Sequence, residues 1–546
     1  MNFRSVSIRT LLLLPAALFA LSACTDEKLV EVEVPVTRPP FNPPADEVNG
    51  FLGLYDVATN QTTCGNCHVN NQGEWAQTAH ADAFATLENS GGAQSFCYAC
   101  HTVSANGNSA GLTTETAGWD VVQSESYRNV QCESCHGPGL EHVSNPTSTN
   151  VPLAYVTVAD TAASCAACHN GTHHPYVEQW SVSAHATFRG GTDEPGDPVT
   201  EPNCVRCHNG KYAIDALTGN APTNYVEKDD ARFALTCAVC HDPHANTNAG
   251  QLRRPIDSPE PTDNLCSTCH IRSAVATPSF TINSRGAHAS QGAVYFGEAA
   301  GWQPPGFTFD PSNPIYTAHL SRNERLCAGC HVAKFTTTDA STGEPFTSVG
   351  HLFSPNPCKD ANGLPTEGDC AYNATARFWT GCVGSGCHNS ETEAAGLFNS
   401  NRTTTKLLLD NLWTDTDGDQ VLDQTDGGVL AAVLRQRPTT TSLADSTHYC
   451  CTNTVRDNSL SVAEGALFNA RMLGENLYSH NDGSYGIHNP ALYNGLIAGS
   501  IQAVRSRYGL PAGIVSSTAE AAIQKALTTQ GVRYADPAAI RQTATR

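Results

Sequence analysis

The pattern Cys64-Gly-Asn-Cys-His68 is the first of eight Cys-x-x-Cys-His copies that decide the fold of this chain. A ninth site, at 382–388, reads CVGSGCH and has four residues between its cysteines instead of two. The chain has 23 Cys and 21 His in 546 residues, and a random chain of this composition would hold only ~0.04 such motifs. The other copies are CYACH (97–101), CESCH (132–136), CAACH (165–169), CVRCH (204–208), CAVCH (237–241), CSTCH (266–270) and CAGCH (327–331).

The repeated motif is the attachment signature of c-type haem. Its two thiols add across the vinyl groups of the porphyrin, and the adjacent His ligates the iron. Zinc sites also use Cys-x-x-Cys, but they do not require a His after every second Cys. The sequence therefore predicts about nine covalent haem c groups. The predicted attachment residues are Cys64, Cys67, Cys97, Cys100, Cys132, Cys135, Cys165, Cys168, Cys204, Cys207, Cys237, Cys240, Cys266, Cys269, Cys327, Cys330, Cys382 and Cys387. The predicted proximal iron ligands are His68, His101, His136, His169, His208, His241, His270, His331 and His388.

The second axial position of each iron needs a further side chain. Twelve of the 21 His lie outside the motifs, so their number slightly exceeds the nine irons. His/Met ligation is essentially excluded, because the chain has only Met1 and Met472. We therefore expect mostly bis-histidine irons with low reduction potentials. The distal candidates are His80, His142, His174, His185, His244, His288, His319, His351 and His488.

The density of motifs indicates the fold class. There is one predicted haem per ~36 residues between Cys64 and His388, and such short segments cannot each build an apolar core. Stacked porphyrins are therefore expected to form the core of a mostly irregular and α fold, with short helices, long loops and little sheet. Longer helices are expected in the C-terminal tail. The predicted parts are a lipoprotein signal peptide (1–23), a Pro-rich acidic linker (24–49), trihaem unit 1 (50–150), trihaem unit 2 (151–260), a diverged trihaem region (261–400) and a helical tail (401–546).

The two trihaem units share landmarks that indicate an internal duplication. Trp75-Ala-Gln-Thr-Ala-His80 and Trp180-Ser-Val-Ser-Ala-His185 each lie between the first and second haem sites of their unit. Each third site is shortly followed by another His. A common local solution reached twice is the alternative explanation.

Residues 64–142 resemble the cytochrome family typified by the tetrahaem electron carrier of ammonia-oxidising bacteria. In that family a Trp-x-x-Ser-x-His segment and a CESCHGPG-type segment followed by His carry haem ligands, and here Thr78 stands where Ser is usual. Residues 165–244 match the same pattern more loosely. The whole-chain pattern also looks like multihaem lipoproteins of bacteria that respire external acceptors. Both resemblances imply electron transfer.

The tail carries three helix-start signals. Ser461-x-x-Glu464 predicts a helix to about Tyr478, and Ser517-x-x-Glu520 predicts another. Asn489-Pro490 predicts a third, which ends at Gly509. The preceding segment with His488 resembles one that delivers a distal His before a long helix in many multihaem cytochromes.

Two further features concern the loops. Alternating carboxylates resemble a calcium loop, because Ca²⁺ prefers hard oxygen ligands, although Gln420 stands where Gly is expected. A solvated acidic turn is the alternative reading of this loop. Cys358 and Cys370 enclose a loop and are candidates for a disulfide in an oxidising compartment, but together with Cys450 and Cys451 they allow three pairings, which the sequence leaves open. The calcium candidates are Asp415, Asp417, Asp419, Asp423 and Asp426.

The first residues predict export. Residues 11–21 form an apolar stretch too short to span a bilayer. Leu21-Ser-Ala-Cys24 resembles a lipobox, in which Cys24 is lipidated, and the alternative is an ordinary cleaved signal peptide. We expect a lipid-anchored protein of the outer membrane, on its periplasmic or cell-surface side, with no membrane contact beyond the anchor.

The charge of the chain limits the class of partner. A formal net charge of −21 argues against a nucleic-acid partner, which needs a basic footprint. The acidity favours solubility or docking on a basic patch of another redox protein.

An electron carrier is the leading hypothesis. If every iron has two protein ligands, the protein can only pass electrons, across the periplasm or to extracellular acceptors and partner redox proteins. One alternative is a reductase or oxidase of small nitrogen or sulfur compounds with one open haem, for which His173 or His174 is a possible proton donor. Another is self-stacking of subunits into a haem filament. The enzyme question stays open, with the carrier favoured.

Overall fold

The computed structural model describes part of the chain, and all of the elements below lie in the compact unit Pro43–Arg546. The predicted signal peptide with Cys24, most of the predicted linker, Cys451, His448 and His480 lie outside the described residues. The described residues are 41–105, 116–147, 149–152, 165–171, 173–187, 204–219, 234–245, 247–272, 274–284, 286–297, 300–310, 318–384, 387–437, 443–444, 449–450, 455–456, 459–474, 482–529 and 531–535.

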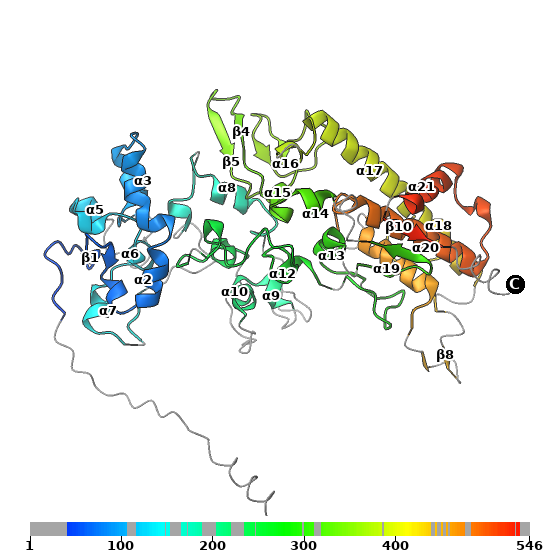
Figure 1. The fold of residues 1–546 in the computed structure, drawn as a ribbon, viewed down its shortest axis with the longest axis horizontal. Helices are drawn as coiled ribbons and strands as arrows, with labels where there is room; N and C mark the ends of the chain where they lie inside the picture. The colour runs from blue at the N-terminus through cyan, green and yellow to red at the C-terminus, as the bar shows by residue number, and fades with distance from the viewer. Residues whose placement is uncertain are drawn as a thin grey trace, which may run out of the picture. The chain divides into compact units, whose positions relative to one another are not determined.

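The haem-motif region consists of short helices joined by loops (Figure 1). Its α-helices are α2 Val69–Trp75, α3 Ala83–Asn89, α4 Tyr98–His101, α5 Gly118–Val121, α6 Cys132–His136, α7 Leu140–Ser144, α8 Tyr176–Ser181, α9 Val205–His208, α10 Gly210–Thr218, α11 Cys237–Cys240, α12 Ser267–His270, α13 Gln291–Phe296, α14 Ala318–Arg322, α15 Leu326–His331 and α16 Thr380–Val383. Its 3-10 helices are η2 Cys64–Asn66, η3 Ala79–Asp82, η4 Ser95–Cys97, η5 Glu125–Tyr127, η7 Cys165–Ala167 and η8 Ala249–Gln251.

The strands of the described residues form two-stranded antiparallel ladders rather than an extended sheet. The ladder of β3 with β10 places Phe309 opposite Val532, and so joins the haem-motif region to the end of the tail. A disulfide between Cys358 and Cys370, with an S–S distance of 2.00 Å, closes the predicted loop. The pairs are β1 Leu54–Asp56 with β2 Gln61–Thr62, β3 Phe307–Phe309 with β10 Val532–Tyr534, β4 Phe335–Thr338 with β5 Pro345–Ser348, β6 Cys358–Lys359 with β7 Pro365–Thr366, and β8 Tyr449–Cys450 with β9 Val455–Arg456.

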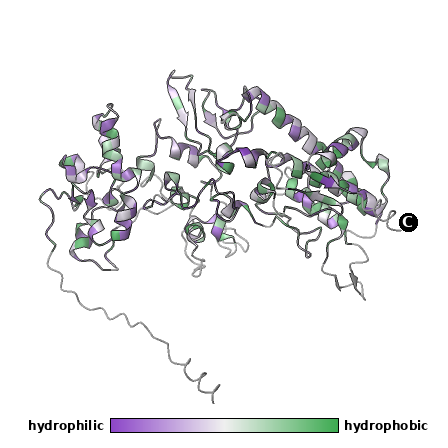
Figure 2. Cartoon of the chain, viewed as in Figure 1, coloured by the Kyte–Doolittle hydropathy of each residue, from purple (hydrophilic) through white to green (hydrophobic). Residues whose placement is uncertain are grey.

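The longest helices lie in the C-terminal part. Helix α20 packs against α17, α19 and α21, and α18 packs against α17, α19 and α20 (Figure 1). Apolar residues gather in these helices (Figure 2), and side chains such as Leu412, Leu467 and Ile497 are fully buried between them. The helices are α17 Glu391–Leu412, α18 Gly428–Arg435, α19 Val462–Leu473, α20 Pro490–Tyr508, η11 Ala512–Ile514 and α21 Ser517–Thr528.

The apolar core is unevenly distributed along the chain. The tail helices share one large cluster of buried apolar residues. The N-terminal haem-motif residues form much smaller clusters, such as Phe51, Val103, Ala117 and Tyr127. Stacked porphyrins would supply the missing interior of such a region. The predicted fold class, mostly irregular and α with longer tail helices, is confirmed.

Two of the three predicted tail helices begin as expected. Ser461 and Glu464 form both halves of a capping box at the start of α19, and Asn489 caps α20 through the backbone N–H of Leu492. Helix α20 ends before Gly509, whose φ of +61° is in the left-handed region that favours glycine. The prediction that the first helix reaches about Tyr478 is wrong, because α19 ends at Leu473 and the backbone turns extended at the next residue.

The third tail helix begins at Ser517, and its N-cap lies one residue before the predicted cap. The N-cap of α21 is Ser516, whose Oγ accepts a hydrogen bond from the backbone N of Ala519 at 3.1 Å. The Glu520 carboxylate accepts from Arg505 Nη1 at 2.7 Å. Among the described residues, no helix has the length and hydrophobicity needed to cross a bilayer.

Candidate haem centres

Each of the eight Cys-x-x-Cys-His motifs forms about one helical turn. The backbone N of the motif His donates to the carbonyl of the first Cys at 3.0 Å in His68, 2.8 Å in His169 and 3.0 Å in His270. Residues three and four apart share one helix face, so this turn places the second thiol and the imidazole on the same side as the first thiol. All eighteen motif cysteines are described, and none of them is in a disulfide. We number these haem-attachment sites 1 to 9 in chain order.

Seven motif imidazoles each face an imidazole from the distal set across a similar gap. The distances between ring centres are 6.3 Å for His68–His142, 6.1 Å for His136–His244, 6.1 Å for His169–His80, 6.1 Å for His208–His288, 6.3 Å for His241–His351, 6.3 Å for His270–His185 and 6.2 Å for His331–His488.

The two remaining motif imidazoles, His101 and His388, interact electrostatically with the two remaining distal candidates, His174 and His319. The ring of His174 also lies 6.2 Å from that of His169, so His169 has two imidazole neighbours. Burial lowers the pKa of His174, and the neighbouring His173 and His101 lower it further. Burial likewise lowers the pKa of His319, and His388 adds to this effect. The structure therefore brings all nine distal candidates close to a motif His. His174 is exposed, as is the neighbouring His173.

The gap between the paired rings fits an iron ion. An imidazole nitrogen binds a metal at ~2.0 Å and its ring centre lies about another ångström away, so two rings on opposite sides of one metal have centres ~6 Å apart. Some aromatic rings that pack directly in this chain are closer, at 4.7 Å for Phe335–Phe378 and 4.4 Å for His185–Phe353, whereas Tyr295 and His488 have the same separation as the imidazole pairs, 6.1 Å. The donor set is therefore suited to bis-imidazole haem.

The tautomer of many candidates is fixed by a backbone carbonyl. A carbonyl only accepts hydrogen bonds, so an Nδ1 beside it carries the proton and leaves the Nε2 lone pair for iron. The pairs and distances are His101–Ala83 (2.8 Å), His142–Asn150 (2.5 Å), His241–Gly250 (2.6 Å), His319–Ile487 (2.8 Å), His331–Phe353 (2.9 Å) and His351–Val349 (3.2 Å).

Burial also keeps several of these rings neutral. Loss of solvation is the main reason why the pKa values of His169, His185, His331 and His351 fall to about 4. The neutral ring is the form that binds a metal. At neutral pH these side chains are therefore ready to act as ligands.

His488 differs in its hydrogen-bond acceptor. Its Nδ1 lies 2.7 Å from Oδ1 of Asp482, whose side chain is 0% exposed. Burial acts to lower the pKa of His488, but the charge and hydrogen bond of Asp482 outweigh it and leave the pKa raised. This ring therefore bonds a buried carboxylate.

The Trp landmarks make the same contacts in both predicted trihaem units. The indole Nε1 of Trp75 donates to the carbonyl of Val130 at 2.9 Å, and that of Trp180 donates to Leu235 at 2.9 Å. Both bonds join residues 55 apart in the sequence. The backbone N of Val130 donates in turn to the carbonyl of His80, and that of Leu235 to His185. Each indole thereby ties its distal candidate to the third motif of the unit.

The ring pairs connect one predicted unit to the next. His80 of unit 1 faces His169 of unit 2, and His244 of unit 2 faces the unit 1 motif His136. His185 of unit 2 likewise faces His270 of the third region. The candidate set could be found by counting His residues, but nothing local in the sequence indicated these pairings.

Attachment cysteines of different sites also lie close enough to change one another's pKa. Burial raises the pKa of Cys135 to about 12 with a contribution from Cys165, and that of Cys330 to about 11 with a contribution from Cys387. Cys240 similarly affects Cys269. Thiol–thiol hydrogen bonds join Cys64 with Cys132, Cys100 with Cys168, Cys165 with Cys237, Cys207 with Cys269, and Cys266 with Cys327.

These hydrogen bonds and electrostatic interactions give the attachment sites an order. Sites 1, 3, 4, 6, 7, 8 and 9 follow one another in a line, while site 2 adjoins site 4 and site 5 adjoins site 7. Because each cysteine would bond to the rim of its porphyrin, hydrogen-bonded cysteines of two sites would bring the rims of two porphyrins close together.

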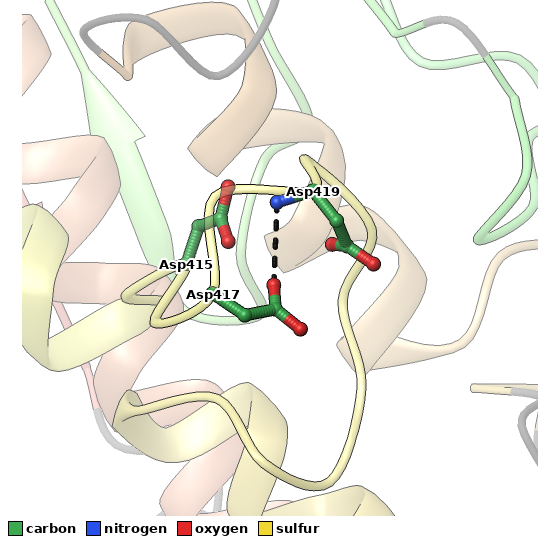
Figure 3. A group of neighbouring side chains, drawn as sticks. All are labelled: Asp415, Asp417 and Asp419. Atoms are coloured by element: carbon green, nitrogen blue, oxygen red, sulfur yellow. Dashed lines mark hydrogen bonds between the residues drawn. The ribbon is translucent and has the colours of Figure 1, made fainter.

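Three of the five calcium candidates form one group. Carboxylate oxygens of Asp415, Asp417 and Asp419 lie within 4.8 Å of one another (Figure 3). Gln420 adopts the left-handed φ of +61° at the position where calcium loops place Gly. Asp426 is instead buried and accepts from Trp413 Nε1 at 2.8 Å, which makes it a structural acceptor. The separate carboxylate of Asp423 accepts from Thr425.

Comparisons with known proteins agree with the haem chemistry. The family "Cytochrome c554 and c-prime" matches residues 63–137, which confirms the resemblance of residues 64–142, and the "Doubled CXXCH motif" family matches residues 231–274. Together with the nine attachment motifs, the family matches and the relatives described below define this chain as a multihaem c-type cytochrome, which carries covalent haem c.

Curated relatives match parts of the chain. The chain is 30% identical over 161 residues to the C-type polyheme cytochrome OmcC of Geobacter sulfurreducens, which covers 27% of this chain and 20% of that protein. It is 25% identical over 157 residues to the multiheme cytochrome MtrA of Shewanella baltica (26% and 42%), and 28% identical over 205 residues to OmcB of Geobacter sulfurreducens (32% and 25%). The chain thus matches less than half the length of each of these relatives. No solved structure matches it.

Proposed function

We propose that this protein is an electron carrier with nine haems, each held by two histidines. The observation that carries the proposal is the set of facing imidazole pairs with ring centres 6.1–6.3 Å apart. His101 with His174 and His388 with His319 complete the proposed ligand set. With both axial positions filled, no iron can bind a substrate, and the haem supplies one-electron storage only.

The order of the attachment sites supports conduction along the chain. Protein contacts hold the motifs so that adjoining sites share touching cysteines. In the proposed path, sites 1 and 9 are the ends of the line and sites 2 and 5 are side branches. These four positions are where we expect donors and acceptors to dock. The repeated indole contacts of Trp75 and Trp180 support the proposed duplication of the trihaem unit.

The proposed setting is outside the cytoplasm. Lipidation at Cys24 would hold the protein at the outer membrane, on the periplasmic or cell-surface side. The acidic chain, with a formal net charge of −21, suits docking to basic patches of other redox proteins, and extracellular acceptors are the second class of partner. Metabolic labelling with a radioactive fatty acid tests the anchor. We expect label in the wild type and none in Cys24→Ala.

Electron paramagnetic resonance and magnetic circular dichroism of the purified protein test the proposal. We expect only low-spin bis-histidine signals, together with a mass that corresponds to nine attached haems. A high-spin iron that binds cyanide or nitrite would contradict the carrier and favour the alternative, a reductase or oxidase with one open haem.

Calcium binding stays a prediction from the sequence, and the grouping of Asp415, Asp417 and Asp419 is consistent with it. Isothermal titration of the holoprotein with Ca²⁺ is the direct test. We expect one binding event that is lost in Asp415→Asn and Asp417→Asn together and retained in the nearby control Asp410→Asn, whose carboxylate pairs with Lys406 instead. No heat of binding in the wild type would leave this loop as a solvated acidic turn.

A further inference from the structure

The loop before α20 gives one iron site a buried negative charge. His488 donates from Nδ1 to Oδ1 of Asp482 at 2.7 Å. In the described part of the chain, His101, His142, His241, His319, His331 and His351 instead bond backbone carbonyls.

A second carboxylate near a distal candidate is arranged differently. Asp242 Oδ1 lies 3.8 Å from Nδ1 of His244, which is beyond hydrogen-bond distance, and Asp242 Oδ2 is paired with Arg253 at 2.8 Å. Its side chain is also 28% exposed, compared with 0% for Asp482. The two carboxylates can therefore be compared. Asp482 is buried and hydrogen-bonded to its imidazole, whereas Asp242 makes no hydrogen bond to the imidazole of His244 and is neutralised by Arg253.

Asp482 is held in place by its surroundings. Its backbone N donates to the carbonyl of Met472 at 3.0 Å, at the end of α19. Its Oδ2 accepts from both the backbone N and the hydroxyl of Ser484. The carboxylate therefore cannot turn away from the imidazole without breaking contacts at both of its ends.

A carboxylate acceptor changes the ligand more than a carbonyl does. It draws the Nδ1 proton towards itself and makes Nε2 a stronger donor to the metal. Charge-assisted hydrogen bonds are roughly twice as strong as neutral ones, and a buried charge is poorly screened. Both effects stabilise oxidised iron, which carries one more positive charge, relative to reduced iron.

We propose that Asp482 lowers the reduction potential of the iron at site 8, held between His331 and His488, below the potentials of its neighbours; this rests on the ligand set proposed above. Site 8 lies between sites 7 and 9 in the order of sites, through the Cys266–Cys327 hydrogen bond and the interaction of Cys330 with Cys387. Asp482 thereby sets an uphill step that separates the last site from the rest of the chain.

The test is a redox titration of the full holoprotein carrying Asp482→Asn, followed by electron paramagnetic resonance. The Asn oxygen still accepts from Nδ1 but carries no charge. We expect the equilibrium constant for reduction to rise at least tenfold, or 59 mV for one electron, at one haem, while the other haems are unchanged. Asp242→Asn is the matched control, and we expect it to cause no such change.

Two outcomes overturn the inference. One is an unchanged titration in Asp482→Asn, and the other is an equal shift in the control, which would make the effect one of general charge. His488→Ala separates this failure from a failure of the proposed ligation. A new high-spin iron in that variant, at full haem content, supports the His331–His488 pair whatever Asp482 does. Only low-spin irons in that variant would overturn the pair itself and the inference with it.

Discussion

Glu133, a residue inside a haem motif, holds two distant segments of the chain together. It lies between the cysteines of the third motif, fully buried, and its carboxylate accepts from the backbone N of Leu52, Gly53 and Gly139. These donors come from the segment before the first motif and from the turn after the third. One carboxylate therefore joins the start of unit 1 to its end.

Removing this carboxylate should destabilise the protein strongly. In Glu133→Ala three buried N–H groups lose their acceptor, and we expect a loss of about 3 kcal/mol or more in the free energy of unfolding. Thermal unfolding followed by circular dichroism measures it. The control Glu125→Ala removes an exposed pair with Arg128 and should change stability by less than about 1 kcal/mol. Equal effects of the two changes would contradict the role of Glu133.

The same residue predicts a pH dependence. Burial raises the pKa of Glu133 to about 7, although its backbone hydrogen bonds act to lower it. Because the carboxyl of an unfolded chain has a pKa of ~4.3, the folded state binds this proton more tightly. The contribution of Glu133 to stability is therefore fully present below the unfolded-state pKa of ~4.3, and it is lost as the pH rises through the folded-state pKa of about 7. We expect the stability of Glu133→Gln to fall less over this range than that of the wild type, and parallel curves would contradict this.

Among the helices, some start signals in the sequence predict the element correctly and others do not. The motif turns and the capping box at Ser461 depend on residues three or four apart, so the sequence shows them directly. Helix α17 was missed although Ser390 caps it, accepting from the backbone N of Glu393 at 3.1 Å. The Ser-x-x-Glu signal was present there. It lies beside the ninth motif, where we expected a haem region rather than a helix.

The N-cap of α21 can be tested by substituting two neighbouring serines. Ser516 Oγ caps the helix, whereas Ser517 is its first residue. We expect Ser516→Ala to lower the free energy of unfolding by about 1 kcal/mol and Ser517→Ala to change it by only a few tenths. Chemical denaturation of the two variants measures the difference. The reverse order of effects would restore the cap predicted from the sequence.

At the scale of the whole molecule, the ligand pairs could not be predicted, because they join residues far apart in the sequence. Two other haem motifs lie between His80 and His169 in the sequence, and the two residues belong to different predicted units. Counting supplied twelve histidines for nine irons, and only the fold shows which distal candidate faces which motif. The order of the attachment sites has the same origin in long-range contacts.

The pairing across units can be tested by combining variants. His80→Ala should leave one iron high-spin, because its ring faces His169 at site 4. Removing site 4 by Cys165→Ala and Cys168→Ala in the same chain should abolish that high-spin signal, since its iron is then absent. Removing site 2 by Cys97→Ala and Cys100→Ala should leave the signal in place. Electron paramagnetic resonance compares the three proteins, and the opposite pattern would assign His80 to its own unit.

The exchange of histidines between units has a consequence for assembly. A chain exported from its N-terminus presents the motif of His136 about 100 residues before its proposed ligand His244 appears. In the same way, His241 is exported before its proposed ligand His351. Each unit is therefore completed by the one that follows it, and an interrupted or shortened chain would end in unfinished, reactive irons. The last of these completions belongs to the tail, through His488, so a part of the protein without any haem motif closes the assembly of the whole.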